Sequence, residues 1–171
     1  IVFMKYSSDW DVLIVVSQNN QQICTLYNVD DSKIINQFST DIKWFSHPFM
    51  PIVGRSGNEP LSLLLVHSNS INISYENNKI IYINNENEYV VYDIESNKNL
   101  MIGSIKGKEI FSVGFLANSK IWIGTIDGYI YVKGLQNEHV EHAIQLEKKW
   151  GDINRVIDVD MGLQYVILQS Y

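Results

Sequence analysis

Short apolar stretches, separated by turn residues, follow one another along the whole chain of 171 residues. Each stretch has the length of a β-strand, and no segment demands a helix. Asparagine pairs such as Asn19-Asn20 lie between the stretches, and such side chains hydrogen-bond their own backbone in tight turns. The first four expected strands are Ile1–Ser7, Asp11–Val16, Gln22–Val29 and Lys33–Phe38. Four such strands in about 40 residues predict one four-stranded antiparallel unit.

The same order of strands and turns returns in the second half of the chain. The expected strands there are Glu109–Leu116, Lys120–Thr125, Tyr129–Val132 and Val140–Leu146. The last of them nearly keeps the alternation of a half-buried strand, and a helix over Asn137–Lys149 is the alternative. Before this set we expect Lys79–Asn84, Tyr89–Ile94 and Leu100–Ile105, and after it Ile153–Asp160 and Gln164–Leu168. The chain therefore reads as a series of β-units.

The ends of the third strands resemble those of WD-repeat β-propellers, where an apolar, an aromatic and an acidic residue close each third strand. Leu26-Tyr27-Asn28 and Val91-Tyr92-Asp93 lie at that place, and Tyr131-Val132-Lys133 matches more loosely. Asp93 and Lys133 are 40 residues apart, which is one repeat, whereas Asn28 and Asp93 are 65 apart. No Gly-His pair marks the starts of the units. The resemblance implies an all-β fold, a β-propeller of four-stranded antiparallel blades with about four blades present, as part of a seven-bladed propeller.

This repeat length predicts one partial propeller over residues 1–171. The expected units are a blade at 1–40, a segment at 41–107, a blade at 108–149 and the start of the next blade at 150–171. The segment 41–107 is longer than a repeat, so it holds either one blade with an insertion or one and a half blades. An insertion would comprise a loop at Pro48–Pro60 and a hairpin of Leu61–Val66 with Ile71–Tyr75; otherwise Ile42–Phe45 and Leu61–Tyr75 form a truncated blade.

The segment 121–132, Ile-Trp-Ile-Gly-Thr-Ile-Asp-Gly-Tyr-Ile-Tyr-Val, is similar to a blade motif in the propellers of large signalling proteins, such as Rho exchange factors and leucine-rich-repeat kinases. On a strand, Ile121 and Ile123 face one side and Trp122 the other. Gly124 permits close packing towards the central channel. The resemblance implies that the residues of this segment serve in packing between blades. It also suggests one possible function, that of a regulatory propeller module in a signalling protein.

Composition and charge narrow the possible functions. Isoleucine is the commonest residue and alanine occurs only at Ala117 and Ala143, which favours strands and excludes a helical bundle. The net charge is −6 and the basic residues are scattered, so we expect no nucleic-acid partner. The apolar stretches are far shorter than the ~20 residues of a membrane span. Cys24 is the single cysteine, which excludes an internal disulfide and favours a cytoplasmic, or nuclear, location.

The candidate reactive residues give no catalytic pattern. His139 and His142 could ligate zinc from one face of a helix, but on a strand their spacing directs them to opposite sides. Cys24 lies in the middle of a strand, where a buried, inert thiol is expected. We therefore expect no enzyme activity, no catalytic residue, no cofactor and no metal.

The segment Ser46–Val53 is the candidate contact site. It places His47, Phe49, Met50 and Ile52 among prolines in a stretch too long for a plain hairpin, and apolar residues on such a loop are candidates for binding a partner. The alternative is that they fold back over a blade edge.

These observations together predict a non-catalytic protein–protein interaction scaffold in a multi-subunit complex. Its partners would be other proteins or the remaining blades of the parent chain, because open sheet edges need cover. The alternative is a regulatory propeller of a multidomain signalling protein, a kinase or a Rho/GTPase exchange factor. A propeller hydrolase or lectin is disfavoured, since no carboxylate cluster or aromatic sugar platform repeats per blade.

Overall fold

A computed structural model describes residues 3–7, 11–43, 55–56, 59–60, 70–74, 78–137, 139–146, 154–159, 162–164 and 166–170. Every regular element in these residues is a β-strand, which confirms the all-β fold. The strands form three four-stranded antiparallel sheets and two two-stranded ones. The expected strand Val140–Leu146 is confirmed, and the alternative of a helix there is wrong, because residues 140–145 form a strand paired with 129–133.

Each four-stranded sheet consists of strands that are consecutive in the sequence. The first sheet contains β1 (Phe3–Ser7), β2 (Val12–Gln18), β3 (Gln22–Asn28) and β4 (Ile34–Thr40). The second contains β7 (Ile71–Ser74), β8 (Lys79–Ile83), β9 (Tyr89–Asp93) and β10 (Lys98–Gly103). The third contains β11 (Ile110–Leu116), β12 (Lys120–Thr125), β13 (Tyr129–Gly134) and β14 (Val140–Gln145). The paired strands β15 (Asn154–Val159) and β16 (Val166–Ser170) follow, and β5 (Arg55–Ser56) pairs with β6 (Glu59–Pro60).

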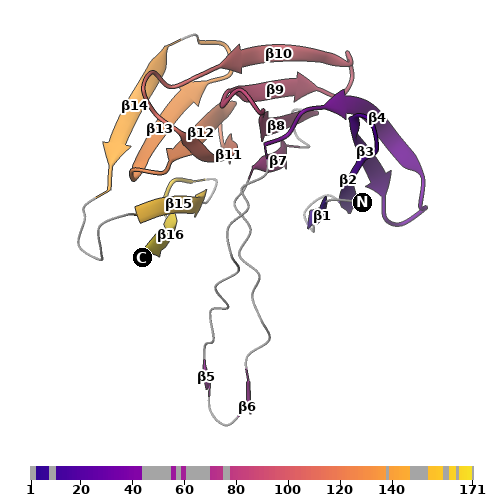
Figure 1. Cartoon of the computed structure of the whole chain (residues 1–171), viewed down its shortest axis with the longest axis horizontal. Helices are drawn as coiled ribbons and strands as arrows, with labels where there is room; N and C mark the ends of the chain where they lie inside the picture. The colour runs from indigo at the N-terminus through magenta and orange to yellow at the C-terminus, as the bar shows by residue number, and fades with distance from the viewer. Residues whose placement is uncertain are drawn as a thin grey trace.

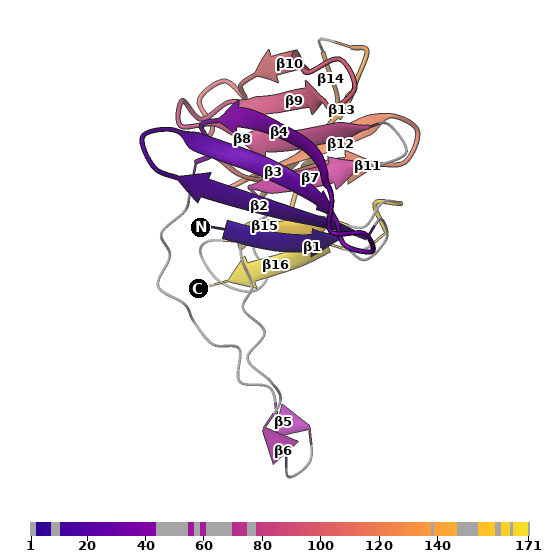
Figure 2. The same ribbon diagram turned by 90° about the vertical axis from the view of Figure 1, so that its right-hand side faces the viewer.

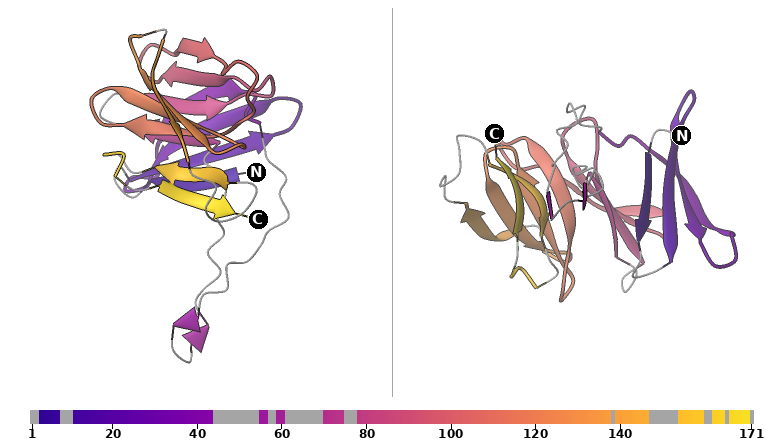
Figure 3. Two further views of the ribbon diagram at one scale, coloured as in Figure 1. Left: turned by 90° about the vertical axis from the view of Figure 1, so that its left-hand side faces the viewer. Right: turned by 90° about the horizontal axis from the view of Figure 1, so that it is seen from below.

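The sheets are fanned out along an arc (Figure 1). The first strand of each sheet lies on the inner side of the arc, where β11 contacts both β7 and β15. The fourth strands β4, β10 and β14 lie on the outer side, and the views in Figures 2 and 3 show the same order from the two ends and from below. This is the arrangement of blades in a propeller.

Apolar side chains on both faces of the sheets hold the arc together. Between the first and second sheets the buried residues are Val12, Ile14, Val16, Cys24, Leu26, Phe38, Ile42, Ile71, Ile73, Ile80, Tyr82, Val90 and Tyr92. Between the second and third they are Ile81, Ile83, Tyr89, Val91, Ile110, Val113, Phe115, Ile121 and Ile123. Between the third sheet and β15–β16 they are Leu116, Trp122, Ile130, Val132, Val156 and Val159. Strands covered on both faces lose the polar alternation, and this explains the isoleucine-rich composition.

The predicted orientation of the 121–132 motif is confirmed. Ile121 and Ile123 pack towards the second sheet, whereas Trp122 packs towards β15 and β16. Gly124 lies where an added Cβ would be 2.8 Å from the Cβ of Val156, so glycine allows the close approach of β15. Gly128 has φ of 82° in the turn between β12 and β13, a conformation that favours glycine.

A β-bulge recurs at one place in all three sheets, between the third and fourth strands. It follows Leu26 in the first sheet, Val91 in the second and Val132 in the third, so these residues are equivalent. The motif has its acidic residue two positions further along the strand. That position holds Asn28 in the first sheet, Asp93 in the second and Gly134 in the third, and Asp93 and Gly134 are 41 residues apart. The looser expected match at Tyr131-Val132-Lys133 is therefore displaced by one residue, because Val132 and not Tyr131 has the cross-strand environment of Leu26.

Candidate functional site

The predicted contact residues His47, Phe49, Met50 and Ile52 lie outside the described residues, and so does the expected strand at 61–66. The structure does describe both ends of the segment that contains them, at residues 41–43 and at Ser70. We call residues 44–69 the insertion. It lies between β4 and β7, that is, between the first and second sheets.

Both ends of the insertion are hydrogen-bonded to the same residue. The backbone N–H of Lys43 donates to the carbonyl of Ile83 at 2.7 Å, and the N–H of Ile83 donates to the carbonyl of Ser70 at 2.9 Å. Ile83 is fully buried at the end of β8. Ile42 also forms a bridge with Asn84, so the chain leaves and returns at one fixed point beside the β8–β9 turn.

The Asn84 side chain holds the β8–β9 turn together through hydrogen bonds to Glu86 and Glu88. Its Oδ1 accepts from the backbone N–H groups of Glu86 and Glu88 at 3.1 and 2.8 Å, and its Nδ2 donates to Glu88 Oε2 at 2.9 Å. Asn84 is buried, so its hydrogen bonds are protected from competition by water. The N–H of Asn85 donates to the carbonyl of Asp41 at 3.0 Å, which ties the turn to the start of the insertion.

A further network connects the base of the insertion with the third sheet. Lys43 Nζ forms an ion pair with Glu109 Oε1 at 3.1 Å. Asn87 lies between them in the fold: its Nδ2 donates to the carbonyl of Lys108 at 3.0 Å and its Oδ1 accepts from the N–H of Ile110 at 3.0 Å. The segment before β11 is thus held against the β8–β9 turn.

Lys108 extends the network to the turn after β12. Its ammonium forms an ion pair with Asp127 and lies 4.1 Å from the ring centroid of Tyr129. Burial pushes the pKa of Asp127 up, but hydrogen bonds from Lys108 and Thr125 outweigh it and hold this pKa below its ordinary value. Asp127 therefore stays ionised at neutral pH. We call Asp41–Lys43, Asn84–Asn87, Lys108–Glu109 and Asp127 the turn surface.

The other reactive candidates do not form a centre. Burial raises the pKa of the Cys24 thiol to about 12, so it is neutral and packed between the first two sheets. His139 and His142 are both exposed, the latter on β14. Within the described ranges, no group of three or more His, Cys, Asp or Glu side chains is placed to hold a metal ion. The same ranges contain no helix that could cross a membrane.

Sequence reasoning located the insertion but missed the turn surface. Its organising residues are Asn84 and Asn87, which in the sequence look like ordinary turn residues. Only the fold shows that Lys43 and Glu109 meet across them, since these two residues are 66 positions apart. The available signal was the Asn-Asn-Glu-Asn-Glu run at 84–88, which is unusually rich in side chains that bind backbone groups.

Comparisons with known proteins show the fold alone. No family model and no curated protein matches the sequence. The chain is similar to the solved structure titled "Structure of U3-55K", with a TM-score of 0.55 and 8% sequence identity. The match covers 88% of this chain and 40% of the other. It is also similar to "Crystal structure of the Saccharomyces cerevisiae Sqt1", with a TM-score of 0.55 and 12% identity over 91% of this chain and 37% of that one. Both are WD-type propellers. The chain spans about two fifths of these structures, and its antiparallel sheets have the arrangement of propeller blades.

Proposed function

We propose that the protein is a non-catalytic scaffold that binds a protein partner through the insertion at residues 44–69. The anchoring of both ends of the insertion to Ile83 carries the proposal. A segment held at one fixed point on a rigid β-framework presents its side chains from a defined place, which is how loops on stable scaffolds acquire binding roles. Phe49, Met50 and Ile52 are the apolar contact residues, with His47 beside them.

The turn surface supports this role. Its ion pairs and buried asparagine bonds give the base of the insertion little freedom to move, so little conformational entropy is lost there when a partner binds. Lys43 joins the base to Glu109, and Lys108 joins the neighbouring segment to Asp127. A partner that engages the insertion would therefore rest on a surface formed by two adjacent sheets.

The blade organisation belongs to the same proposal. The units are a blade at 1–40, one blade with an insertion at 41–107, a blade at 108–149 and the start of another at 150–171, within a propeller of about seven blades. The two-stranded pairing of β15 with β16 supports the incomplete fourth unit, and the pairing of β7 with β8 supports a single blade at 41–107. The remaining blades come from the parent chain. The proposed location is cytoplasmic or nuclear, and the buried free thiol of Cys24 supports it.

The test is a pair of matched variants expressed in the native source, with bound proteins identified by mass spectrometry. Phe49→Ala with Met50→Ala removes apolar area from the insertion; Leu100→Ala with Ile102→Ala removes it from β10, where each side chain is 54% exposed. We expect the first variant to lose a partner at least tenfold while its unfolding midpoint is unchanged, and the second to keep that partner. If the Phe49→Ala, Met50→Ala variant keeps the partner but unfolds at a lower midpoint, the insertion covers a blade edge instead of binding a partner.

The alternative, a regulatory module of a signalling enzyme, depends on the motif at 121–132. In the structure Ile121, Trp122 and Ile123 are all fully buried between sheets, so this motif supports the fold and favours neither function. The flanking sequence of the parent protein decides between them: a kinase or GTPase motif would favour the signalling module, and helical repeats the scaffold.

A further inference from the structure

One lysine lies inside the interface between the second and third sheets. Lys133 belongs to β13 and is only 7% exposed. Its ammonium donates a hydrogen bond to Tyr89 Oη at 2.7 Å and lies 5.3 Å from the centroid of the Tyr89 ring. Among the described residues, no carboxylate forms an ion pair with Lys133. A buried cation with a neutral partner costs free energy, so its presence calls for a role other than stability.

The recurrent bulge shows which residues correspond to Lys133 and to its surroundings in the other sheets. Counted from the bulge, Lys133 on β13 is equivalent to Tyr92 on β9. Each of these two side chains packs on one cross-strand pair of the preceding sheet, and we call this pair the seat. In sheet order, the three seats are Cys24 with Phe38, Tyr89 with Gly103, and Ile130 with Ile144.

The first seat fits an aromatic ring. The ring of Tyr92 stacks on Phe38 with centroids 4.1 Å apart and an interplanar angle of 17°. Cys24 beside it is buried and neutral, because burial raises the pKa of its thiol to about 12. The two side chains of this seat contain no oxygen atom. A lysine packed on them would therefore be buried without an acceptor for its ammonium.

The second seat fits a lysine. The Tyr89 hydroxyl supplies the acceptor, and it is itself buried in the interface. Gly103 makes room for Tyr89, since a Cβ at residue 103 would collide with the phenol ring. A large side chain there, such as Phe38 in the first seat, would displace the hydroxyl from its place. Lys133 and this seat therefore agree both in hydrogen bonding and in volume.

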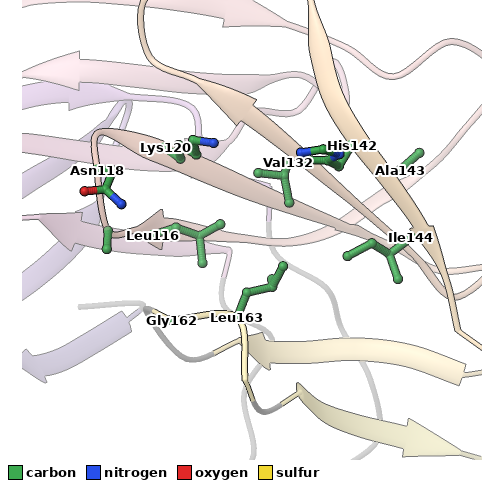
Figure 4. Close-up of a pocket in the computed structure, with 10 residues that line it drawn as sticks. Leu116, Asn118, Lys120, Val132, His142, Ala143, Ile144, Gly162 and Leu163 are labelled. Carbon is green, nitrogen blue, oxygen red and sulfur yellow. The ribbon is translucent and has the colours of Figure 1, made fainter.

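The third seat is apolar and lies beside a groove between the third sheet and the β15–β16 pair (Figure 4). The groove has a volume of about 450 Å³, and Val132 and Ile144 face Leu163 across it. Ile130 and Ile144 offer neither a ring nor a hydroxyl. If the third sheet of a second copy packed here, its Lys133 would again find no acceptor in the seat.

We propose that Lys133 is a pairing determinant that admits the third sheet only to the seat of Tyr89 and Gly103. The three four-stranded sheets share one strand order and one bulge, so the third sheet could otherwise pack on the first or third sheet of a second copy. The cost of an ammonium buried without an acceptor opposes both wrong arrangements. The buried lysine thus specifies which sheets meet, and this inference is independent of the role of the insertion.

A double-mutant cycle tests whether Lys133 and Tyr89 act as a pair. Tyr89→Phe should lower the folding equilibrium constant about tenfold or more, because the buried ammonium loses its acceptor. Adding Lys133→Met should restore at least the parent value, since both polar partners are then replaced by apolar groups of similar shape. Urea unfolding of the 171-residue chain measures both constants. A lysine that only fills space would instead give two costs that add.

Refolding of the double variant, Tyr89→Phe with Lys133→Met, tests the specificity. Each protein is unfolded in urea, diluted at high protein concentration and analysed by sedimentation. We expect the double variant to form a several-fold larger oligomeric fraction than the parent. When two isotope-labelled batches are mixed, crosslinks should join the third sheet of one copy to the first or third sheet of another. The control is Lys98→Met, which removes an exposed lysine of β10 and should refold like the parent.

Three results would overturn the proposal. The first is a neutral Tyr89→Phe, or costs that add in the cycle. The second is a double variant that refolds with no more oligomer than the parent, which would show that the lysine excludes nothing. The third is equal oligomer formation by Lys98→Met, because the loss of one positive charge would then suffice. If Tyr89→Phe alone fails to fold, the double variant still decides, since it is expected to fold.

Discussion

Replacing Gly124 by alanine tests how closely the third sheet and β15 approach each other. An added Cβ would lie 2.6 Å from Ser112 Oγ and 2.8 Å from Val156 Cβ, both too short for real contacts. The same serine hydroxyl donates to the carbonyl of Val156 at 2.5 Å, and Ser112 is fully buried. Gly124→Ala therefore forces β15 outward and pushes the hydroxyl off its acceptor.

Two costs and one opposing gain set the size of the effect. Overpacking a dense interface costs about 1–3 kcal/mol. Separating a buried donor from its acceptor costs about 1–3 kcal/mol more. The reduced freedom of the unfolded chain when glycine becomes alanine offsets about 0.4–1 kcal/mol. The free energy of unfolding should therefore fall by about 1–5 kcal/mol, with a central value of about 3 kcal/mol.

Urea unfolding followed by tryptophan fluorescence measures this change, and a double-mutant cycle tests its cause. Ser112→Ala alone should cost about 1–3 kcal/mol, but close to nothing when Gly124→Ala has already broken the hydrogen bond. Gly107→Ala is the control, because an added Cβ at Gly107 would have no atom within 4 Å. Its backbone has φ of 69°, so the backbone strain of alanine alone should cost about 1–2 kcal/mol. A neutral Gly124→Ala, or strictly additive costs in the cycle, would refute the close approach.

Three further predictions concern single side chains. Trp122 is fully buried and its indole N–H has no acceptor among the described residues, so Trp122→Phe should stay within about 1 kcal/mol of the parent while Trp122→Ala loses about 3–5 kcal/mol in urea unfolding. Cys24, with its pKa raised to about 12, should react with a thiol reagent at pH ~8 at least a hundredfold more slowly in the folded protein than in urea; equal rates would contradict its burial. Hydrogen bonds from Ser96 hold the pKa of Asp93 below its ordinary value of 3.8, so its contribution to stability is present above about pH 4 and is lost as the pH falls through the folded value. The difference in unfolding free energy between the parent and Asp93→Asn should therefore be largest near pH ~6 and shrink as the pH falls below about 4.

The order of strands could be predicted from the sequence because turn chemistry and strand length are local properties. Every expected strand between Lys79 and Thr125 lies within one or two residues of an observed one. The face of each residue at 121–123 followed from the two-residue period alone. The ambiguous segment after Asn137 resolved as a strand because β13 offers it a partner edge, which is a tertiary effect that no local pattern contains.

The candidate site could be predicted only in part. The segment 41–107 is longer than one repeat, and this length indicated an insertion. Its anchoring could not be predicted, because Lys43 lies 40 positions and Ser70 13 positions from Ile83 in the sequence, and a single sequence does not reveal such contacts.

Photo-crosslinking in the native source tests most directly whether the insertion binds a partner. A photoreactive amino acid is placed at Met50, and in a parallel sample at Leu100, which is exposed on β10. We predict that the probe at position 50 attaches a second protein while the probe at position 100 does not. Crosslinks from position 50 to the protein's own sheets, with no partner attached, would contradict the proposal and show that the insertion covers a blade edge.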